Sequence, residues 1–271
     1  MFKSPGPVIY DFSDLLPFDF ALRWYGTLIG LGFFVACSIV FLLVKKESNE
    51  TQRNNLLDLL FFCFFGGIIG ARLWFVVLNA TYFLSNPLES VQIWHGGQSI
   101  QGGFLGAIVA GLLFYSIKKA DGKPNEFLNR YKVCDLLAVA LPFGQAIGRW
   151  GNFFNNEAFG LPTKLPWALF IPEQSRPFQY IGFTTFHPTF LYEFIYLLAC
   201  GLLMLFLYKR EVVKPGVLLC LYFILYSLGR FAIEFIRIDS LMIGPFAAAH
   251  VICFATIAAA SFFAYKFSNI K

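Results

Sequence analysis

Charged residues are scarce in this chain, and their scarcity limits the classes of protein to which it can belong. Only 14% of its 271 residues are Asp, Glu, Lys or Arg, and 58% are apolar. A soluble domain carries about 25% charged residues. This composition excludes a soluble globular fold, a disordered chain, a collagen-like repeat and a nucleic-acid-binding protein. A membrane β-barrel is excluded as well, because its strands alternate polar and apolar residues. The sequence therefore predicts an all-α integral membrane protein.

Histidine and cysteine, the side chains that most often bind metals, are also few. The chain has three His and six Cys. No pair of cysteines has C-x-x-C spacing, and all six lie within or at the edge of apolar runs, so we interpret them as small buried apolar residues. Disulfide or metal roles are the lesser alternative. We expect no metal and no cofactor. The six cysteines are Cys37, Cys63, Cys134, Cys200, Cys220 and Cys253.

What the chain has in abundance is long apolar runs. About 20 apolar residues in a helix span the hydrocarbon core of a bilayer. Seven such runs predict a single seven-helix membrane domain over residues 1–271. Residues 1–18 lack the features of a cleavable signal peptide, so we expect the first run to be retained. The predicted spans are 19–44, 57–79, 100–117, 133–151, 188–208, 216–236 and 243–265.

The basic residues predict the orientation of this bundle. Thirteen of the 21 Lys and Arg residues fall in the connections 45–56, 118–132 and 209–215 and in the C-terminal tail. Cytoplasmic loops carry an excess of Lys and Arg. We therefore expect the N-terminus outside the cell and the C-terminus in the cytoplasm.

The longest connection, residues 152–187, lies on the predicted outer side. Long loops are usually functional or disordered. A mobile linker is the plain alternative, but Trp167, Phe170, Phe178 and Tyr180 favour a small folded extracytoplasmic cap.

Three arginines lie inside predicted spans, and each would cost about 2.5–3.5 kcal/mol at the bilayer centre. Arg72, Arg149 and Arg230 are all near the predicted outer ends of their helices. Each of them alone could extend its head group to the interface or pair within its own helix, as Arg230 could with Glu234. Their common depth instead favours convergence on one anion. Phospholipid head groups are the anions available there, and a planar guanidinium suits them.

Glycines surround these polar positions. Gly66 and Gly70 precede Arg72, and Gly102 and Gly106 follow Gln101. Small residues at such spacings let helix backbones approach closely or let the chain break at a turn. Helix packing alone and a polar site explain these clusters equally well.

One segment carries a specific resemblance. Residues 148–160, G-R-W-G-N-F-F-N-N-E-A-F-G, closely resemble the signature of the prolipoprotein diacylglyceryl transferase family. Further matches follow the family's order along nearly the whole chain: W-Y-G at 24–26, G-A-R at 70–72, the glycine-rich segment 96–106, H-P-T-F-L-Y-E at 187–193 and Y-S-L-G-R-F-A-I-E-F-I-R at 226–237.

The resemblance implies a seven-span enzyme of the bacterial inner membrane. Members of this family move the diacylglyceryl group of phosphatidylglycerol to the lipobox cysteine of a prolipoprotein signal peptide, forming a thioether and releasing glycerol phosphate. The modified precursor then passes to the lipoprotein signal peptidase. The resemblance implies no metal or nucleotide, and nothing in the sequence demands more than a monomer.

The resemblance also implies roles for individual residues. Arg149 and Arg230 match the essential arginines that hold the phosphate. Asp135 and His187 fall on family-like positions where scaffold and site are equally expected. For Arg72, Glu234 and Arg237 the resemblance implies a supporting role. The full set of matches to substrate-binding positions is Tyr25, Arg72, Asn152, Glu157, Gly160, Tyr226, Glu234 and Arg237.

One departure from the family concerns catalysis. The family usually has H-G-G in the glycine-rich segment, and a catalytic role is attributed to that histidine. Here the triplet is Gln101-Gly102-Gly103, and glutamine cannot accept a proton at neutral pH. Either the histidine is not an obligatory base, or another group acts, or this chain is impaired. His95 is a conceivable substitute and is more often a plain interfacial residue, whereas we expect His250 to be a hydrogen-bonded core residue.

Three other functions compete. An anion transporter would also place arginines in spans, but it would show two related halves, which are not found here. A retinal-type receptor needs a lysine in mid-span, and the last span has none before Lys266. A non-catalytic lipid-binding relative is the alternative that Gln101 raises.

Overall fold

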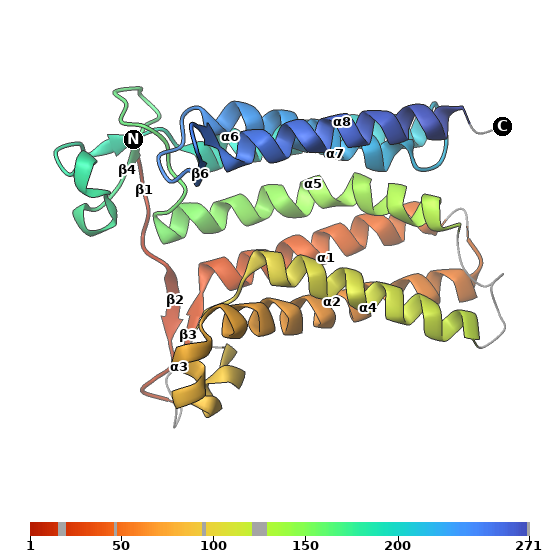
Figure 1. Cartoon of the computed structure of the whole chain (residues 1–271), viewed down its shortest axis with the longest axis horizontal. Coiled ribbons are helices and arrows are strands. Elements are labelled where there is room, and N and C mark those ends of the chain that lie inside the picture. Colours follow the sequence, from red (N-terminus) through yellow and green to blue (C-terminus); the bar gives the residue numbers. More distant parts are fainter. Residues whose placement is uncertain (16–19, 46–47, 94–95, 121–128, 270–271) are drawn as a thin grey trace. The chain divides into compact units, whose positions relative to one another are not determined.

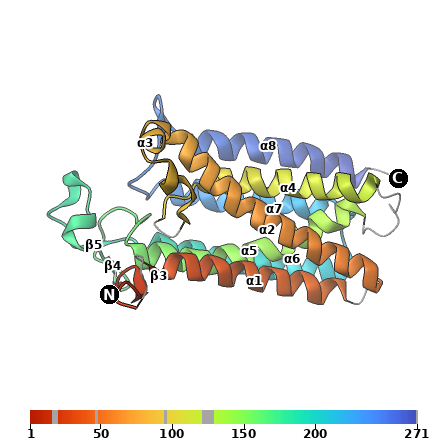
Figure 2. The same ribbon diagram turned by 90° about the horizontal axis from the view of Figure 1, so that it is seen from below.

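The computed structural model of the chain describes residues 1–15, 20–45, 48–93, 96–120 and 129–269, and it is mostly helical (Figure 1 and Figure 2). Short strands and 3-10 turns connect the helices. Seven of the described helices have 18 residues or more, and they are α1 (Trp24–Val44), α2 (Glu50–Leu78), α4 (Ile100–Ala120), α5 (Arg130–Asn155), α6 (Thr189–Arg210), α7 (Val217–Glu234) and α8 (Ala248–Ser268).

Six of these helices are long and apolar enough to cross a membrane, which confirms the predicted class of all-α integral membrane protein. The six are α1, α2, α4, α6, α7 and α8. Helix α5 coincides with the predicted span 133–151 but is less apolar, because it carries Asp135, Gln145, Arg149 and Asn152. That helix brings polar groups to the site described below, so the number of seven spans stays a prediction.

Several helix ends differ from the predicted ones for local reasons. Helix α2 begins at Glu50 rather than 57, because the Asn49 side chain accepts a hydrogen bond of 2.8 Å from the Gln52 amide and caps its polar first turn. Helix α1 begins at Trp24 because β3 (Ala21–Arg23) pairs with β2 (Val8–Asp11) before it. Helix α8 begins at Ala248 because a two-stranded hairpin, β6 (Met242–Ile243) with β7 (Phe246–Ala247), precedes it.

The chain forms two compact units. The first comprises Met1–Tyr10, Leu22–Val40 and Arg130–Lys271, and the second comprises Asp11–Ala21 and Phe41–Asn129. In the first unit α5 packs against α6 and α7, and α7 packs against α8. The α1 segment of this unit meets α5 at a pair of glycines: a Cβ on Gly32 would lie 2.6 Å from the carbonyl oxygen of Gly144. The absence of side chains there allows close backbone packing.

A carboxylate fixes the start of α7 against α5. Gly216 has a left-handed conformation with φ of 92°. The Asp135 carboxylate of α5 accepts hydrogen bonds from the amides of Gly216 (2.7 Å) and Leu219 (3.0 Å). These amides are among the unpaired donors of a helix N-terminus, where a negative charge is favourable. Asp135, for which scaffold and site were equally expected, therefore acts as a structural cap.

In the second unit α2 packs along α4 through glycine. A Cβ on Gly70 would lie 2.7 Å from the Cα of Gly106, and one on Gly66 would lie 2.8 Å from the Gly106 carbonyl oxygen. Gly102 faces Gly70 in the same way. These residues form a small-residue contact of the kind that membrane helices use. Of the two explanations for this glycine cluster, the geometry supports helix packing.

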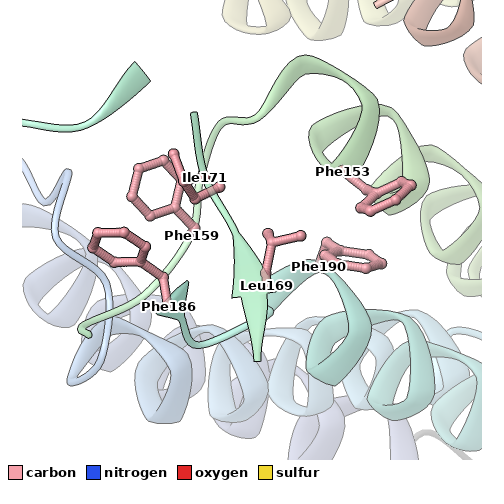
Figure 3. Close-up of a cluster of buried hydrophobic side chains, with 6 residues drawn as sticks. All are labelled: Phe153, Phe159, Leu169, Ile171, Phe186 and Phe190. Atoms are coloured by element: carbon pink, nitrogen blue, oxygen red, sulfur yellow. The ribbon is translucent and has the colours of Figure 1, made fainter. Parts of the chain in front are cut away.

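The connection between α5 and α6 packs around one apolar core together with the adjoining ends of both helices. Figure 3 shows six buried side chains there: Phe153, Phe159, Leu169, Ile171, Phe186 and Phe190. Strand β4 (Leu169–Phe170) lies between β1 (Phe2–Lys3), which is parallel to it, and β5 (Thr185–Phe186), which is antiparallel. The segment predicted as a cap thus has a defined structure, and its extracytoplasmic location stays a prediction.

Candidate functional site

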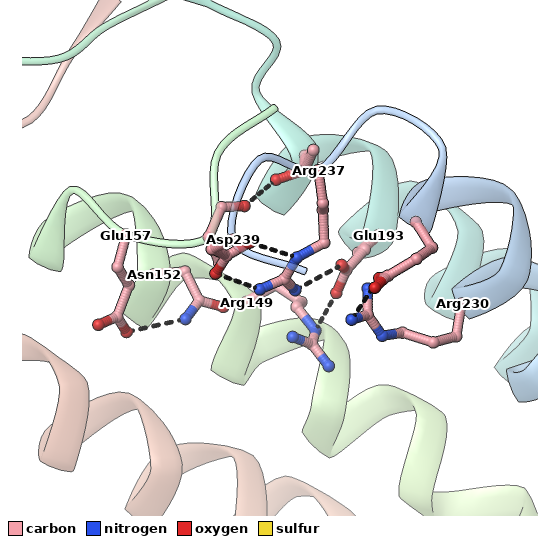
Figure 4. Close-up of polar contacts among 10 residues, drawn as sticks. Arg149, Asn152, Glu157, Glu193, Arg230, Arg237 and Asp239 are labelled. Carbon is pink, nitrogen blue, oxygen red and sulfur yellow. Dashed lines mark hydrogen bonds and ion pairs between the residues drawn. The ribbon is translucent and has the colours of Figure 1, made fainter. Parts of the chain in front are cut away.

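The site in the first unit is built on an arginine of α5. Arg149 lies near the end of α5 that leads into the folded connection. Its Nε lies 2.6 Å from Oε2 of Glu193, which is on the first part of α6. The side chains are 23% and 11% exposed, respectively. Figure 4 shows the two terminal nitrogens of Arg149 directed away from Glu193. Those nitrogens are available for a further acceptor.

A second arginine pairs within its own helix. Nη2 of Arg230 lies 2.6 Å from Oε2 of Glu234, four residues further along α7. This is the i,i+4 pairing that the sequence offered as the simpler interpretation. The pairing is incomplete, however, because Nη1 of Arg230 is buried and has no partner within the described part of the chain. A buried donor without an acceptor is costly, by about 1–3 kcal/mol or more for a charged group.

The two arginines share one cleft. Arg149 and Arg230 both line one cleft between α5, α6 and α7. The remaining lining is mostly apolar or aromatic, as ligand sites usually are. It consists of Glu193, Tyr196, Leu197, Tyr226, Gly229 and Ile233. An anion entering this cleft can meet two guanidinium groups among mostly apolar and aromatic side chains.

Tyr226 and Tyr25, both predicted from the family pattern, belong to the same unit. Tyr226 lines the cleft, and its ring stacks on Tyr222 with centroids 6.0 Å apart. Tyr25 lies on α1 within the electrostatic influence of Glu157 and Arg149. Its ring occupies the space beside Gly151, where a Cβ would lie 2.6 Å from Cδ2 of the ring. Glycine at 151 therefore allows Tyr25 to approach α5.

The signature residues after Arg149 form a compact turn. Nδ2 of Asn152 donates to Oε1 of Glu157 at 2.9 Å, and Nδ2 of Asn155 donates to the same oxygen at 3.3 Å. Asn156 and Ala158 have positive φ values of 53° and 56°, which L-residues rarely adopt. Figure 4 shows Glu157 and Asn152 apart from Glu193 and Arg230. The described contacts make the Glu157 carboxylate an organiser of this turn.

Gly160 and Arg237 close the connection against the end of α7. The two residues form an antiparallel β-bridge, and the Leu161 amide donates to the carbonyl of Ile236 at 2.7 Å. A Cβ on Gly160 would lie 2.8 Å from both the Cβ of His187 and the carbonyl oxygen of Ile236. A side chain at position 160 would therefore separate the connection from α7.

The Arg237 side chain is held by two carboxylates. Its Nε and Nη2 donate to the two oxygens of Asp239 at 2.8 and 2.6 Å, and its Nη1 lies 4.0 Å from Oε1 of Glu193. Burial opposes the charge of Arg237, but the hydrogen bonds and charge of Asp239 outweigh it and raise the pKa of Arg237. Arg237 therefore stays charged beside Glu193.

Arg72, in the second unit, has a different environment. It is only 8% exposed and donates to four backbone carbonyls: Ser90 at 2.8 Å, Gly96 at 2.7 Å, Gly97 at 2.9 Å and Glu89. Its guanidinium also lies over the ring of Phe83, 5.3 Å from the centroid. Arg72 thus holds the backbone at residues 89–90 and 96–97, as a supporting residue would.

Gln101 lies at the start of α4, where its Oε1 accepts a 2.7 Å hydrogen bond from Ser99. Its side chain is exposed within this unit. His95, its conceivable substitute, lies outside the described residues. His250 packs between the rings of Phe231 and Phe235, and its Nε2 lies 3.2 Å from the Phe231 carbonyl oxygen. This geometry agrees with the expectation that His250 is a hydrogen-bonded residue packed within the fold.

His187 belongs to a chain of polar contacts in the folded connection. Its Nδ1 lies 3.1 Å from the hydroxyl of Tyr192, which also accepts a 3.0 Å hydrogen bond from Nε1 of Trp167. These contacts favour a scaffold role. Cys200, Cys220 and Cys253 are buried free thiols, as small apolar residues would be. Within the described residues no group of three or more His, Cys, Asp or Glu could hold a metal ion.

Two acidic residues of the site were not predicted. Glu193 pairs with Arg149, and Asp239 holds Arg237. The signal for Glu193 was present, because it ends the H-P-T-F-L-Y-E match, but a carboxylate at a helix end gives no indication of which helix it faces. Asp239 lies outside every matched segment.

Fold and site together define a class: an integral membrane protein of long helices that keeps paired arginines and carboxylates in an apolar cleft, an arrangement suited to an anionic group at a membrane. Comparison with known proteins identifies the family. The profile of the family described as prolipoprotein diacylglyceryl transferase matches residues 14–266. The chain belongs to this family, and the resemblance predicted from its motifs is confirmed.

Curated relatives match this chain along most of their length. The phosphatidylglycerol–prolipoprotein diacylglyceryl transferase of Thermotoga maritima is 45% identical over 234 residues, which cover 86% of this chain and 76% of the relative. The enzyme of the same name from Thermosynechococcus vestitus is 41% identical over 261 residues, or 96% of this chain and 91% of the relative. That of Synechococcus elongatus is 39% identical over 262 residues, or 95% and 86%.

Proposed function

We propose that this chain is a transferase that moves the diacylglyceryl group of phosphatidylglycerol to the lipobox cysteine thiol of prolipoproteins. The reaction forms a thioether and releases glycerol phosphate. The names of its relatives identify the two substrates. The observation that carries the proposal is the shared cleft, where Arg149 and Arg230 are each held on one side by a carboxylate 2.6 Å away.

In this proposal the two arginines bind the phosphate of the lipid. The cysteine sulfur attacks the glycerol carbon that carries the phosphate, the carbon–oxygen bond breaks, and its electron pair leaves with the phosphate. The thiol proton is released to water or to the leaving phosphate. Charge therefore grows on the phosphate oxygens as the bond breaks. Guanidinium groups oriented in advance stabilise that charge in an apolar cleft more strongly than water would.

The proposal does not require a strong base. A thiol with a pKa near 8.5 is a few per cent thiolate at neutral pH, and nearby positive charge increases that fraction. Positioning of the thiol and the lipid in one cleft contributes further. A glutamine at position 101 is compatible with such a mechanism, because no step of it requires a base at that position.

The remaining matched residues are proposed to bind or support the lipid. Tyr226 lines the cleft, and Tyr25 lies near Arg149, so these two are suited to direct contact. Glu234 and Arg237 hold charged partners in place. Asn152, Glu157 and Gly160 shape the turn after Arg149, and Arg72 shapes its own segment.

The chain is a multi-pass membrane protein. We place it in the bacterial inner membrane as a monomer, with its N-terminus outside and its site in the outer half of the bilayer. Phosphatidylglycerol would then enter sideways from the outer leaflet, because its acyl chains are costly to bring through water. The modified precursor would pass to the lipoprotein signal peptidase.

The test is a direct transfer assay. The purified chain is incubated with phosphatidylglycerol vesicles and a peptide that carries a lipobox cysteine, and the product is weighed by mass spectrometry. The expected product is the peptide plus one diacylglyceryl group. A peptide with serine in place of the cysteine and vesicles of phosphatidylethanolamine are the controls. Lipid binding without any adduct would instead identify a non-catalytic relative.

A further inference from the structure

Glu193 is the carboxylate around which the charged side chains of the first unit are arranged. It lies near the start of α6, and each of its two oxygens faces an arginine from a different part of the chain. Oε2 meets Nε of Arg149 at 2.6 Å, and Oε1 lies 4.0 Å from Nη1 of Arg237 (Figure 4). Glu193 also lines the cleft itself.

The burial of Glu193 indicates that its ion pair with Arg149 has a role other than stabilising the fold. Its side chain is 11% exposed, so its negative charge has lost most of its hydration. A buried ion pair gains little stability, because the cost of removing both charges from water offsets their attraction. Apolar residues of similar volume in place of the whole pair would often be as stable, whereas removing one partner alone leaves a buried charge unpaired. The pair is better explained by what it does to the orientation of Arg149.

The atom that Glu193 contacts is informative. A guanidinium can present either its Nη1–Nη2 edge or its Nε side to an acceptor, and bidentate binding of a phosphate uses two parallel donors. Because Glu193 occupies Nε, the terminal edge of Arg149 is the one left for a ligand. Arg230 is arranged differently, since Glu234 holds Nη2, one nitrogen of the terminal edge, and leaves Nη1 buried without a partner in the described residues.

Arg237 restrains Glu193 in turn. Asp239 grips Arg237 through two hydrogen bonds, and Arg237 then faces the second oxygen of Glu193. The carboxylate therefore has a positive group on each side, and turning away from Arg149 would separate it from one of them. The orientation of Arg149 is thus supported by a continuous row of charges that ends in the segment after α7.

We propose that Glu193 is a positioning residue: it holds Nε of Arg149 so that the two terminal nitrogens face the cleft and align with the phosphate that leaves. The inference rests on the proposed function and adds to it a residue that acts through Arg149 rather than on the substrate. An Arg149 that has lost this contact still attracts the lipid by its charge but no longer directs its donors at the breaking bond.

The experiment compares three variants at position 193 in the transfer assay. Glu193→Ala is expected to lower kcat by about tenfold or more, with KM for phosphatidylglycerol within about twofold, because misorientation affects the transition state more than binding. Glu193→Gln keeps an oxygen that accepts from Nε, so kcat should stay within about threefold of the wild type. Glu193→Asp keeps the charge but is one methylene too short, and its kcat should fall between the other two.

The control is Glu211→Gln, which removes the same charge from the exposed far end of α6 and should leave kcat and KM unchanged. Thermal unfolding followed by tryptophan fluorescence shows whether each variant is folded. If Glu193→Ala is not folded, the comparison of Glu193→Gln with Glu193→Asp tests the inference.

A kcat of Glu193→Ala close to the wild-type value would overturn the inference. So would equal losses in Glu193→Gln and Glu193→Ala, since these would mean that the charge or a proton, and not the contact, is required. Where Ala does not fold, an Asp variant as active as the Gln variant would also overturn the inference, because the shorter side chain does not keep the contact with Nε of Arg149. An inactive wild-type chain would instead refute the proposed function, so the two failures are distinguishable.

Discussion

Three arginines in apolar helices have different partners, and the partners distinguish their roles. Arg72 donates to four backbone carbonyls, so its hydrogen-bonding capacity is used within its own unit. Arg149 and Arg230 instead meet carboxylates on one side and line a cleft on the other. A buried arginine that has only backbone partners shapes the chain, whereas one with unused donors at a cleft can bind a ligand.

From this difference we expect Arg149→Ala and Arg230→Ala to abolish transfer, each lowering kcat by about 100-fold or more, the range observed when one donor to a developing charge is removed. Gln101→Ala should lower the rate by less than about tenfold, since an amide at this position cannot act as a base. The measurement is the rate of adduct formation in vesicles. A nearly normal rate for Arg149→Ala would refute the assignment of the phosphate to these arginines.

Arg72→Lys is expected to destabilise the protein rather than alter chemistry selectively. A lysine has three donors on one nitrogen and cannot reach four separated carbonyls, so buried acceptors lose their partners at a cost of about 2–4 kcal/mol. The midpoint of thermal unfolding in detergent should fall. Arg53→Lys serves as the control because Arg53 is partly exposed on α2 and should tolerate the change. Equal midpoints for the two variants would contradict the structural role of Arg72.

At this scale the sequence identified the arginines but not all of their partners. Burial of a charge is visible in sequence, because a lone arginine among apolar residues must have a function. The Arg230–Glu234 pair was also visible, since the two residues lie four apart on one helix. Glu193 and Asp239 were not, because pairing between elements depends on how helices turn toward one another.

At the scale of elements, glycine sets how closely helices approach. In the second unit α2 and α4 are in contact where a side chain on either helix would meet the backbone of the other. The predicted spans matched helices throughout, yet their ends shifted wherever a cap or a short strand replaced the first turn. The Asn49 cap lengthened α2, and the β6–β7 hairpin delayed α8. Such ends depend on single hydrogen bonds and have no signal in hydropathy.

Gly106→Ala tests this contact. The added Cβ would lie 2.8 Å from the Cα of Gly70 and still closer to the Gly66 carbonyl oxygen, so α2 and α4 must separate. Crowding of this kind costs about 1–3 kcal/mol. We expect a lower unfolding midpoint in detergent, measured by tryptophan fluorescence. Gly30→Ala, on α1, is the matched control because no atom lies within 4 Å of its added Cβ. Identical midpoints would exclude close packing at Gly106.

For the whole molecule, the sequence predicted the class and family, while the number of spans and the orientation stay predictions. The polar residues of α5 explain why six of the described long helices, and not all seven, are apolar enough to cross a membrane. One of those residues is Arg149, so the helix least like a membrane span contributes one of the two arginines of the cleft. The composition of a helix is an average over all its residues. It therefore does not distinguish a membrane helix that has one polar, functional face from a helix that lies outside the membrane.

Orientation can be measured with a maleimide that does not cross membranes. Ser175→Cys places a thiol in the folded connection, and Glu211→Cys places one in the exposed turn after α6. If the N-terminus is outside, intact cells or spheroplasts should label the first variant and not the second, and both should react after lysis. The unsubstituted chain measures the background, because Cys200, Cys220 and Cys253 are buried but Cys37, Cys63 and Cys134 are only partly so. The reverse pattern would show that the basic residues were assigned to the wrong side.

The cap that Asp135 provides for α7 has a consequence for the lipid. Asp135 contacts the amide of Gly216, and from each of these residues an arginine lies 14 positions further along its helix, at Arg149 and Arg230. At 1.5 Å per residue both lie about 21 Å from the common starting point. Because the two stretches have the same number of residues, Arg149 on α5 and Arg230 on α7 lie at the same level along the two helices. Inserting one residue into either stretch would raise one arginine by about 1.5 Å and rotate it by about 100°, a displacement that no side-chain adjustment at the cleft would correct.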